Sequence, residues 1–236
     1  MKKLVIAGSI REIYEYEKTI IGKGGHKEIK DLIQKEKNYQ NQNIRRRNNI
    51  RRLVCANFIN TDSKFLTLTF ADNITDIKFC NKEFKNFIKR LKYNYNLNNL
   101  KYVAVIEFQK RGAVHYHVML TTPYIPLQEI QTLWGHGFVF INKINNVDNL
   151  GAYLVKYMTK DSSDTRLQGE MAYLHSRNLK KPIEVSNINC PDLFNSHMMI
   201  LEQKIKQKKC TPVYESTYDT ECLGQCYYQQ YNLDRI

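Results

Sequence analysis

A hairpin around His115-Tyr116-His117 constrains this chain more than any other segment. Residues 101–108 and 113–120 are rich in β-branched and apolar residues, and the turn between them, residues 109–112, ends in a glycine. Because successive side chains of a strand point to opposite faces, the two histidines project to one face about 7 Å apart, and Tyr116 projects to the other. Two imidazoles in this arrangement are suited to a metal ion.

Glu107 is the third candidate metal ligand. It alternates with Val103 and Val105, so its carboxylate is expected near the turn, within reach of a cation held by the histidines. The alternative is a pair of surface histidines without a metal, since the chain contains six histidines. The expectation of a metal site therefore depends on what the segments after the hairpin supply.

The flanking segments predict an α+β fold with one antiparallel sheet. Residues 65–70 alternate apolar residues with threonine, which is typical of a half-buried strand. Apolar residues recur at helical spacing over residues 84–95 and 126–134, and residues 138–143 form a further apolar strand. The order β-α-β-β-α-β is the ferredoxin-like (RRM-like) arrangement, in which the third strand, here the one with the histidines, is internal.

A polar helix is expected over residues 27–54, inside an N-terminal extension of residues 1–60 that begins with short edge strands. Five arginines of this helix are expected to bind DNA: Arg45, Arg46, Arg47, Arg51 and Arg52. No comparable acidic run lies nearby, so phosphate contact is favoured over a merely solvated helix face. The core is expected at residues 61–185 and a C-terminal extension at residues 186–236.

The net charge of +13 and the isoelectric point near 9.4 favour a nucleic acid as partner. Lys and Arg outnumber Asp and Glu by 14 to 6 in residues 1–60 and by 13 to 7 in residues 61–160, whereas residues 161–236 carry 9 against 10. The polyanion is therefore expected to contact the first two-thirds of the chain. No long apolar run or basic anchor indicates a membrane partner.

The six cysteines are too scattered for a disulfide framework, and the apolar run at the N-terminus is too short for a secretory signal. Both observations predict a reducing, cytoplasmic location. Cys222 and Cys226, together with Cys210, could bind zinc, but free thiols are favoured because the chain has no second closely spaced pair.

A second helix that carries chemistry is expected over residues 148–160. Its apolar residues form a buried stripe, and a neighbouring stripe carries Tyr153, Lys156, Tyr157 and Lys160. A phenol with a pKa near 10 needs a cation or a base nearby to act as a nucleophile, and Lys156 lies within the same turn. Tyrosines that only pack the helix are the alternative, and the adjacent histidine pair favours the chemical role.

Together, three segments resemble the motifs of the HUH endonucleases, which initiate rolling-circle replication. Residues 65–70 resemble the first motif, residues 112–117 the second, and Tyr153-x-x-Lys156-Tyr157 the third, in the right order over about residues 61–160. The paired tyrosines, and residues 176–182 after them, are similar to those of initiators from single-stranded DNA phages and bacterial plasmids. Tyr116 is a departure, because an aliphatic residue is frequent at that position.

The resemblance implies a metal-dependent DNA endonuclease and strand transferase. His115, His117 and Glu107 would hold Mg²⁺ or Mn²⁺, which polarises the scissile phosphate. Tyr153, placed ahead of Tyr157 by its motif position, would attack to leave a 5′-phosphotyrosine.

The resemblance also implies partners and the remaining site residues. Lys156 would neutralise developing charge, and the DNA contacts of the arginine helix would be extended by Lys110, Arg111 and Lys160. The substrate would be single-stranded DNA at a replication origin. A host helicase and polymerase in a bacterial cytoplasm are implied because the chain has no Walker motif.

Two alternatives stay open. One is a non-catalytic nucleic-acid-binding regulator on the same RRM-like sheet, although residues 65–70 and the hairpin do not present the paired stacking aromatics that such a sheet uses. The other is a transposase or relaxase of a mobile element, which would use the same catalytic constellation.

Overall fold

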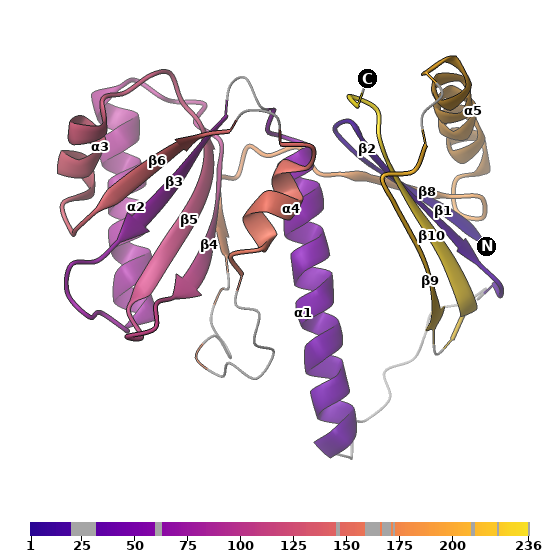
Figure 1. Cartoon of the computed structure of the whole chain (residues 1–236), viewed down its shortest axis with the longest axis horizontal. Helices are drawn as coiled ribbons and strands as arrows, with labels where there is room; N and C mark the ends of the chain where they lie inside the picture. Colours follow the sequence, from indigo (N-terminus) through magenta and orange to yellow (C-terminus); the bar gives the residue numbers. More distant parts are fainter. Residues whose placement is uncertain are drawn as a thin grey trace. The chain divides into compact units, whose positions relative to one another are not determined.

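A computed structural model describes residues 1–19, 32–59, 63–144, 147–158, 166, 171, 173–208, 211–220 and 222–235. The chain forms two compact units (Figure 1). The central unit comprises Lys37–Lys180, and the terminal unit combines Met1–Glu36 with Lys181–Ile236. The chain therefore leaves the terminal unit after its first segment and returns to it after the central unit is complete.

The central unit contains the predicted β-α-β-β-α-β order. Its elements are β3 (Ser63–Thr69), α2 (Ile77–Asn94), β4 (Tyr102–Phe108), β5 (Val114–Thr121), α3 (Leu127–Trp134) and β6 (Val139–Lys143). The sheet has the order β6-β3-β5-β4-β7, and all its neighbours pair antiparallel. The predicted α+β fold is confirmed, and β5, with the two histidines, is internal. The strand β7 (Tyr173–His175), which extends the sheet beside β4, was not predicted.

One face of this sheet is covered by α2 and α3. Asp76 caps α2 by accepting hydrogen bonds from the backbone amides of Lys78 and Phe79, and Gly135 ends α3 in the left-handed conformation, with φ of 72°. Apolar residues of both helices pack against the sheet around Tyr116, which is fully buried. The expectation that the central residue of the histidine motif faces the core is thus confirmed.

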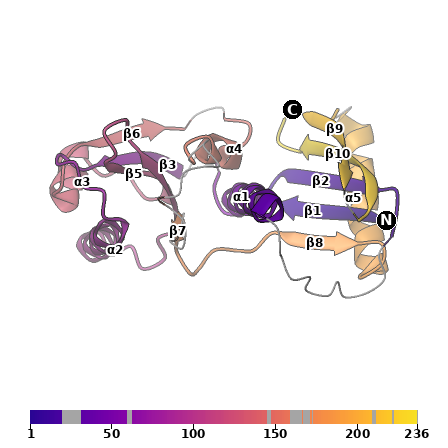
Figure 2. The ribbon, with the colours of Figure 1, turned by 90° about the horizontal axis from the view of Figure 1, so that it is seen from below.

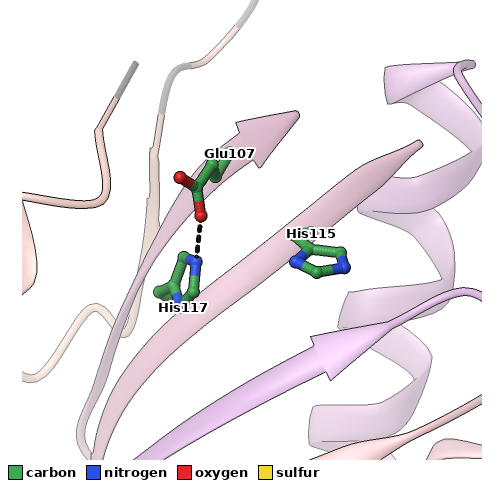
Figure 3. A group of neighbouring side chains, drawn as sticks. All are labelled: Glu107, His115 and His117. Carbon is green, nitrogen blue, oxygen red and sulfur yellow. Dashed lines mark hydrogen bonds and ion pairs between the residues drawn. The ribbon is translucent and has the colours of Figure 1, made fainter. Parts of the chain in front are cut away.

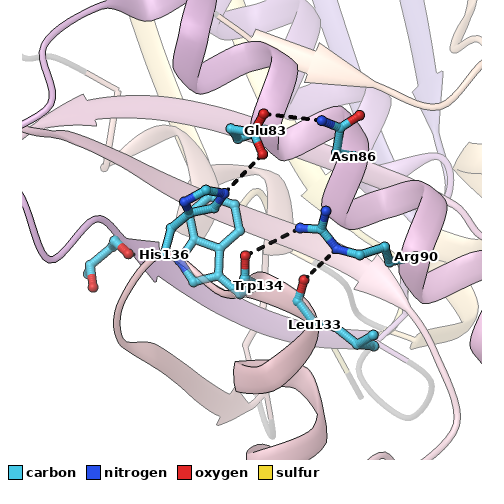
Figure 4. A network of polar contacts seen from close by, with 7 residues as sticks. Glu83, Asn86, Arg90, Leu133, Trp134 and His136 are labelled. Carbon is cyan, nitrogen blue, oxygen red and sulfur yellow. Dashed lines mark hydrogen bonds and ion pairs between the residues drawn. The ribbon is translucent and has the colours of Figure 1, made fainter.

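Polar contacts tie α2 to the end of α3 and to the loop that follows (Figure 4). Arg90 donates from Nε and Nη2 to two backbone carbonyls at the end of α3, at 2.8 and 3.3 Å. His136 Nε2 lies 3.0 Å from Oε2 of Glu83. Trp134 Nε1 donates to the carbonyl of Thr69 at 2.8 Å. These bonds hold the start of β6 beside the end of β3.

The other face of the sheet is covered by α1 (Leu32–Cys55) and α4 (Leu150–Val155). Figure 2 shows α2 and α4 on opposite sides of the sheet. Ile50 and Val54 of α1 and Leu154 of α4 join a second buried core on this face. The predicted arginine helix is therefore present from Leu32. The part predicted for residues 27–31, and residues 159–160 of the second predicted helix, lie outside the described residues, and α4 ends at Val155.

The terminal unit is a second antiparallel sheet, of order β8-β1-β2-β10-β9. Its elements are β1 (Lys2–Ala7), β2 (Ile10–Tyr16), β8 (Ile183–Ser186), α5 (Pro191–Lys208), β9 (Tyr214–Thr220) and β10 (Gly224–Asn232). Leu4, Ile13 and Tyr231 form a core with Phe194 and Leu201 of α5. The expectation that the first strands are edge strands is wrong, because β1 and β2 both pair on two sides. Among the described helices, none is long and apolar enough to cross a membrane.

Candidate active site

The Glu-His-His group lies on the sheet face that α1 and α4 cover. Cross-strand pairing places Glu107 of β4 directly opposite His115 of β5, and Val105 opposite His117 (Figure 3). One possible ligand atom from each of the three residues, Glu107, His115 and His117, lies within 4.8 Å of the others. The two-residue period of the strands and the register of the hairpin are sufficient to bring these groups together.

Each side chain of the Glu-His-His group is held differently. His117 is 5 % exposed, and its Nε2 lies 2.5 Å from Oε2 of Glu107. Its other nitrogen, Nδ1, lies 3.2 Å from the hydroxyl of Thr67, which is directly opposite on β3. In contrast, Nε2 of His115 is buried and has no hydrogen-bond partner among the described residues.

Burial sets the charge of the two histidines. It lowers the pKa of His115 to about 4, and the neighbouring His117 adds to this effect. Burial also lowers the pKa of His117, although its hydrogen bond to Glu107 acts in the opposite direction. Both imidazoles are therefore neutral at pH 7, which is the state that binds a metal ion.

These residues fit a divalent cation. The donors are two imidazole nitrogens and one carboxylate oxygen, a set that suits Mn²⁺ as well as other first-row metals. The unpartnered buried Nε2 of His115 also supports a ligand at this position, since buried polar atoms are rarely left without a partner. Thr67 would then orient His117 from behind by accepting a hydrogen bond from Nδ1.

The two tyrosines lie beside this group, with Tyr153 on α4 and Tyr157 in the turn after it. The ring of Tyr157 stacks on His117, with centroids 4.0 Å apart and planes inclined by 24°. Phe65 of β3 packs between the elements, with its ring 5.0 Å from that of Tyr153 and 5.2 Å from that of Tyr157. The two hydroxyls are 3.4 Å apart. A single group approaching the histidines would therefore meet both phenols.

Lys156 is close to both phenols and lies over their rings. Its Nζ is 3.8 Å from the ring centroid of Tyr153 and 4.8 Å from that of Tyr157. Desolvation by burial raises the pKa of Tyr153, the hydrogen bond from Tyr157 adds to the rise, and Lys156 opposes it. The protein alone thus keeps Tyr153 protonated, so its activation needs a further positive charge or a base.

The position of α4 is fixed by two local features. Asn149 caps the helix by accepting a hydrogen bond from the amide of Ala152 at 2.8 Å. Gly151 packs against the backbone of Arg51 in α1 so closely that a Cβ atom would overlap the Arg51 carbonyl. Glycine is therefore required where α4 crosses α1, two residues before the first tyrosine.

The basic residues predicted to bind DNA differ in their exposure. Arg45 and Lys110 are exposed, Arg46, Arg47 and Arg51 are half-buried, and Arg52 is only 8 % exposed. Arg111 donates to the carbonyls of Phe70 and Ala71, at 2.6 and 2.9 Å, and to the side chain of Gln109. These bonds fasten the hairpin turn to the end of β3. Lys160 lies outside the described residues.

Four residues near this site were not singled out by the sequence analysis: Thr67, Phe138, Phe140 and Asn142. Thr67 is the partner of His117, and a hydrogen bond to Asn142 lowers the pKa of Tyr153. Strand periodicity assigns each of these residues to a face, but only the order of the strands shows that the face is shared with the histidines. The threonines that alternate in residues 65–70 were the only available signal.

Fold and site together define a protein with a ferredoxin-like α+β core, a Glu-His-His group that could hold a metal ion, and two tyrosines beside it. Residues 63–162 match the model of a family of replication-associated proteins, the ORF2 type. The matched segment begins at β3 and extends past α4, so it includes the whole Glu-His-His group and both tyrosines. The match supports a replication initiator, and hence interaction with DNA. Comparisons with curated proteins and with solved structures gave no match.

Proposed function

We propose that the protein initiates rolling-circle replication by nicking single-stranded DNA at an origin and rejoining it through a 5′-phosphotyrosine. The observation that carries this proposal is the stacking of Tyr157 on His117, which places two phenols against a Glu-His-His group. A nucleophile that must attack a phosphate held by a metal would need this proximity. The match of residues 63–162 to a replication-associated family agrees with it.

The metal ligands in this proposal are His115, His117 and Glu107, and Mg²⁺ or Mn²⁺ is the expected ion. When bound, such an ion supplies Lewis-acid polarisation of the scissile phosphate. His117 is oriented for this task by Thr67, and both histidines are neutral ligands at pH 7 because burial lowers their pKa values. The carboxylate of Glu107 contributes a negative charge that offsets that of the cation.

The reaction in this proposal exchanges one phosphodiester for another. A tyrosine hydroxyl loses its proton and its oxygen bonds to phosphorus, while the bond from phosphorus to the 3′-oxygen breaks and that oxygen takes up a proton. Lys156 lies over both rings and stabilises the phenolate and the negative charge that develops. The resulting 3′-hydroxyl can prime a host polymerase, and a host helicase is the expected source of unwinding.

The second tyrosine serves the joining step. With one phenol holding the 5′-end, the other can attack the newly made junction, because their hydroxyls are only 3.4 Å apart. The motif position favours Tyr153 as the first nucleophile, whereas the stacking on His117 favours Tyr157. Phosphodiester energy is retained in the covalent intermediate, so rejoining requires no ATP.

The test is covalent capture of DNA. Purified protein is incubated with Mn²⁺ and a pool of single-stranded oligonucleotides from the DNA around the gene, and adducts are resolved on a denaturing gel. We expect an adduct that needs the metal, that the single variants Tyr153→Phe and Tyr157→Phe reduce unequally, and that the double variant loses. Tyr93→Phe, at an exposed residue of α2, is the matched control. Tight binding that ignores chelators, without any adduct, would instead support a non-catalytic nucleic-acid-binding regulator.

A further inference from the structure

Two large apolar side chains are exposed on the sheet face that carries the Glu-His-His group. Phe138 is 72 % exposed and Phe140 is 60 % exposed, whereas Val139 between them is buried in the core below α2 and α3. Because side chains alternate along a strand, both phenylalanines project to the opposite face, the one with the histidines. Exposed phenylalanines that share a face with a polar site are a candidate binding surface.

Strand pairing shows how the two rings are placed relative to the Glu-His-His group. Phe140 of β6 pairs with Thr67 of β3, and Thr67 pairs on its other side with His117. Phe138 lies in the next row of the same face, beside Thr69, which pairs with His115. Two strand spacings of about 4.8 Å separate each phenylalanine from its histidine. Both rings are thus roughly 10 Å from the metal ligands along the sheet surface.

The backbone below these rings is held firmly although the rings themselves are open. The hydroxyl of Thr69 donates to the carbonyl of Phe138 at 2.9 Å and accepts from its amide at 3.0 Å, and the amide of Thr69 donates to the same carbonyl. Within the described part of the chain, neither phenylalanine packs against another aromatic ring. Such a rigid, uncovered pair is preorganised to receive flat groups.

We propose that Phe138 and Phe140 form a stacking platform for the bases of single-stranded DNA next to the tyrosines. This inference rests on the proposed function, which supplies the substrate. Asn142, two residues further along the same face of β6, contributes a hydrogen bond to Tyr153, so β6 leads from the nucleophile to the two rings. A strand whose phosphate lies at the Glu-His-His group can therefore place neighbouring bases on Phe140 and Phe138.

Single-stranded nucleic acid is favoured over other occupants by charge and chemistry. The central unit carries 22 Lys and Arg against 10 Asp and Glu, which attracts a polyanion. Unpaired bases expose faces that stack on aromatic rings with little dependence on sequence, whereas bases in a duplex are already stacked. The platform therefore selects single-stranded DNA and leaves the sequence to other contacts.

The test measures DNA affinity without chemistry. The Tyr153→Phe/Tyr157→Phe protein, in chelator, is titrated into fluorescently labelled oligothymidylate. We expect Phe138→Ala and Phe140→Ala each to weaken binding about tenfold, with Phe140→Trp retaining affinity and Phe140→Leu losing it. Affinity for duplex DNA should not change. Tyr93→Ala removes an equally exposed ring from α2, on the opposite face of the sheet, and is the matched control.

Two results would overturn the platform. One is unchanged affinity of both alanine variants for oligothymidylate. The other is a wild-type dimer in sedimentation that the alanine variants convert to a monomer with unchanged DNA affinity, because the rings would then form a contact between copies. The platform and the nickase fail separately: loss of binding in the alanine variants without any covalent adduct supports the platform and contradicts the nickase, and an adduct with unchanged affinity does the reverse.

Discussion

Thr67 decides which nitrogen of His117 can face a metal ion. Without metal, Nε2 of His117 donates to Glu107, and Nδ1 accepts from the Thr67 hydroxyl. A metal at Nε2 requires the proton to move to Nδ1, and Thr67 can accept it there because a hydroxyl both donates and accepts. The threonine therefore supports both protonation states of the ring.

Replacing Thr67 with valine tests this role. Thr67→Val keeps the shape of the side chain but leaves Nδ1–H of the metal-bound ring without a partner, so we expect Mn²⁺ affinity to fall about 10- to 100-fold. Titration calorimetry with Mn²⁺ measures the change directly. Thr132→Val, on α3, is the control. Equal affinities of Thr67→Val and the wild type would contradict the orienting role.

The buried histidines also predict how stability depends on pH. The pKa of His115 is lowered to about 4 in the folded protein and is close to 6.5 when unfolded. Between these values the unfolded chain binds more protons, so the free energy of unfolding rises with pH from about 4 to 6.5. Urea titrations of the metal-free protein should show this rise, and His115→Asn should reduce its slope. His175→Gln, at an exposed histidine, is the control and should leave the slope unchanged.

At the residue scale, the sequence predicted the groups that lie on one strand or one helix. The shared face of His115, His117 and Glu107 follows from the period of two, and the common side of Tyr153 and Tyr157 follows from the helical spacing. Thr67, Phe138, Phe140 and Asn142 depend on which strand lies beside which, and no local pattern encodes that. The raised pKa of Tyr153 similarly depends on burial by distant segments.

At the scale of elements, the short helix α4 positions the tyrosines through its close contact with α1. Alanine at position 151 would normally favour the helix by about 1 kcal/mol relative to glycine. Here its Cβ would overlap the carbonyl of Arg51, so α4 must move away from α1.

We therefore expect Gly151→Ala to destabilise the protein by about 1–3 kcal/mol and to reduce adduct formation. Chemical denaturation and the covalent-capture assay measure the two effects. Ala152→Val adds bulk at the exposed neighbouring position and is the control for disturbance of the helix itself. Stabilisation by Gly151→Ala would show that the helix–helix contact does not constrain α4.

Among the elements, the six of the β-α-β-β-α-β core were predictable because each has a strong period of its own. The strands β7, β9 and β10 were not predicted. β7 has only three residues, and β9 and β10 are rich in tyrosine and polar residues without clear alternation. The interior position of β1 and β2 depends on their pairing with β8 and β10, which lie near the other end of the sequence. Such long-range pairing leaves no local signal.

At the scale of the whole molecule, the positive charge belongs almost entirely to the central unit. The terminal unit carries 14 Lys and Arg against 13 Asp and Glu, so the central unit holds +12 of the net +13. The unit with the Glu-His-His group, the tyrosines and the arginines of α1 is thus also the unit that attracts a polyanion. The terminal unit, nearly neutral, has no comparable electrostatic attraction for DNA.

This distribution of charge predicts a strong and local dependence of DNA binding on salt. For single-stranded DNA, the slope of log K against log[salt] is about −0.7 for each phosphate neutralised. Replacing Arg45, Arg46 and Arg47 by glutamine should make the slope less steep by up to about 2, in proportion to how many of the three contact phosphates. Replacing Lys204 and Lys206 of α5 in the terminal unit should leave the slope unchanged. Equal slopes for the arginine variant and the wild type would show that α1 does not contact the DNA backbone, and would restrict the electrostatic interaction to residues nearer the tyrosines.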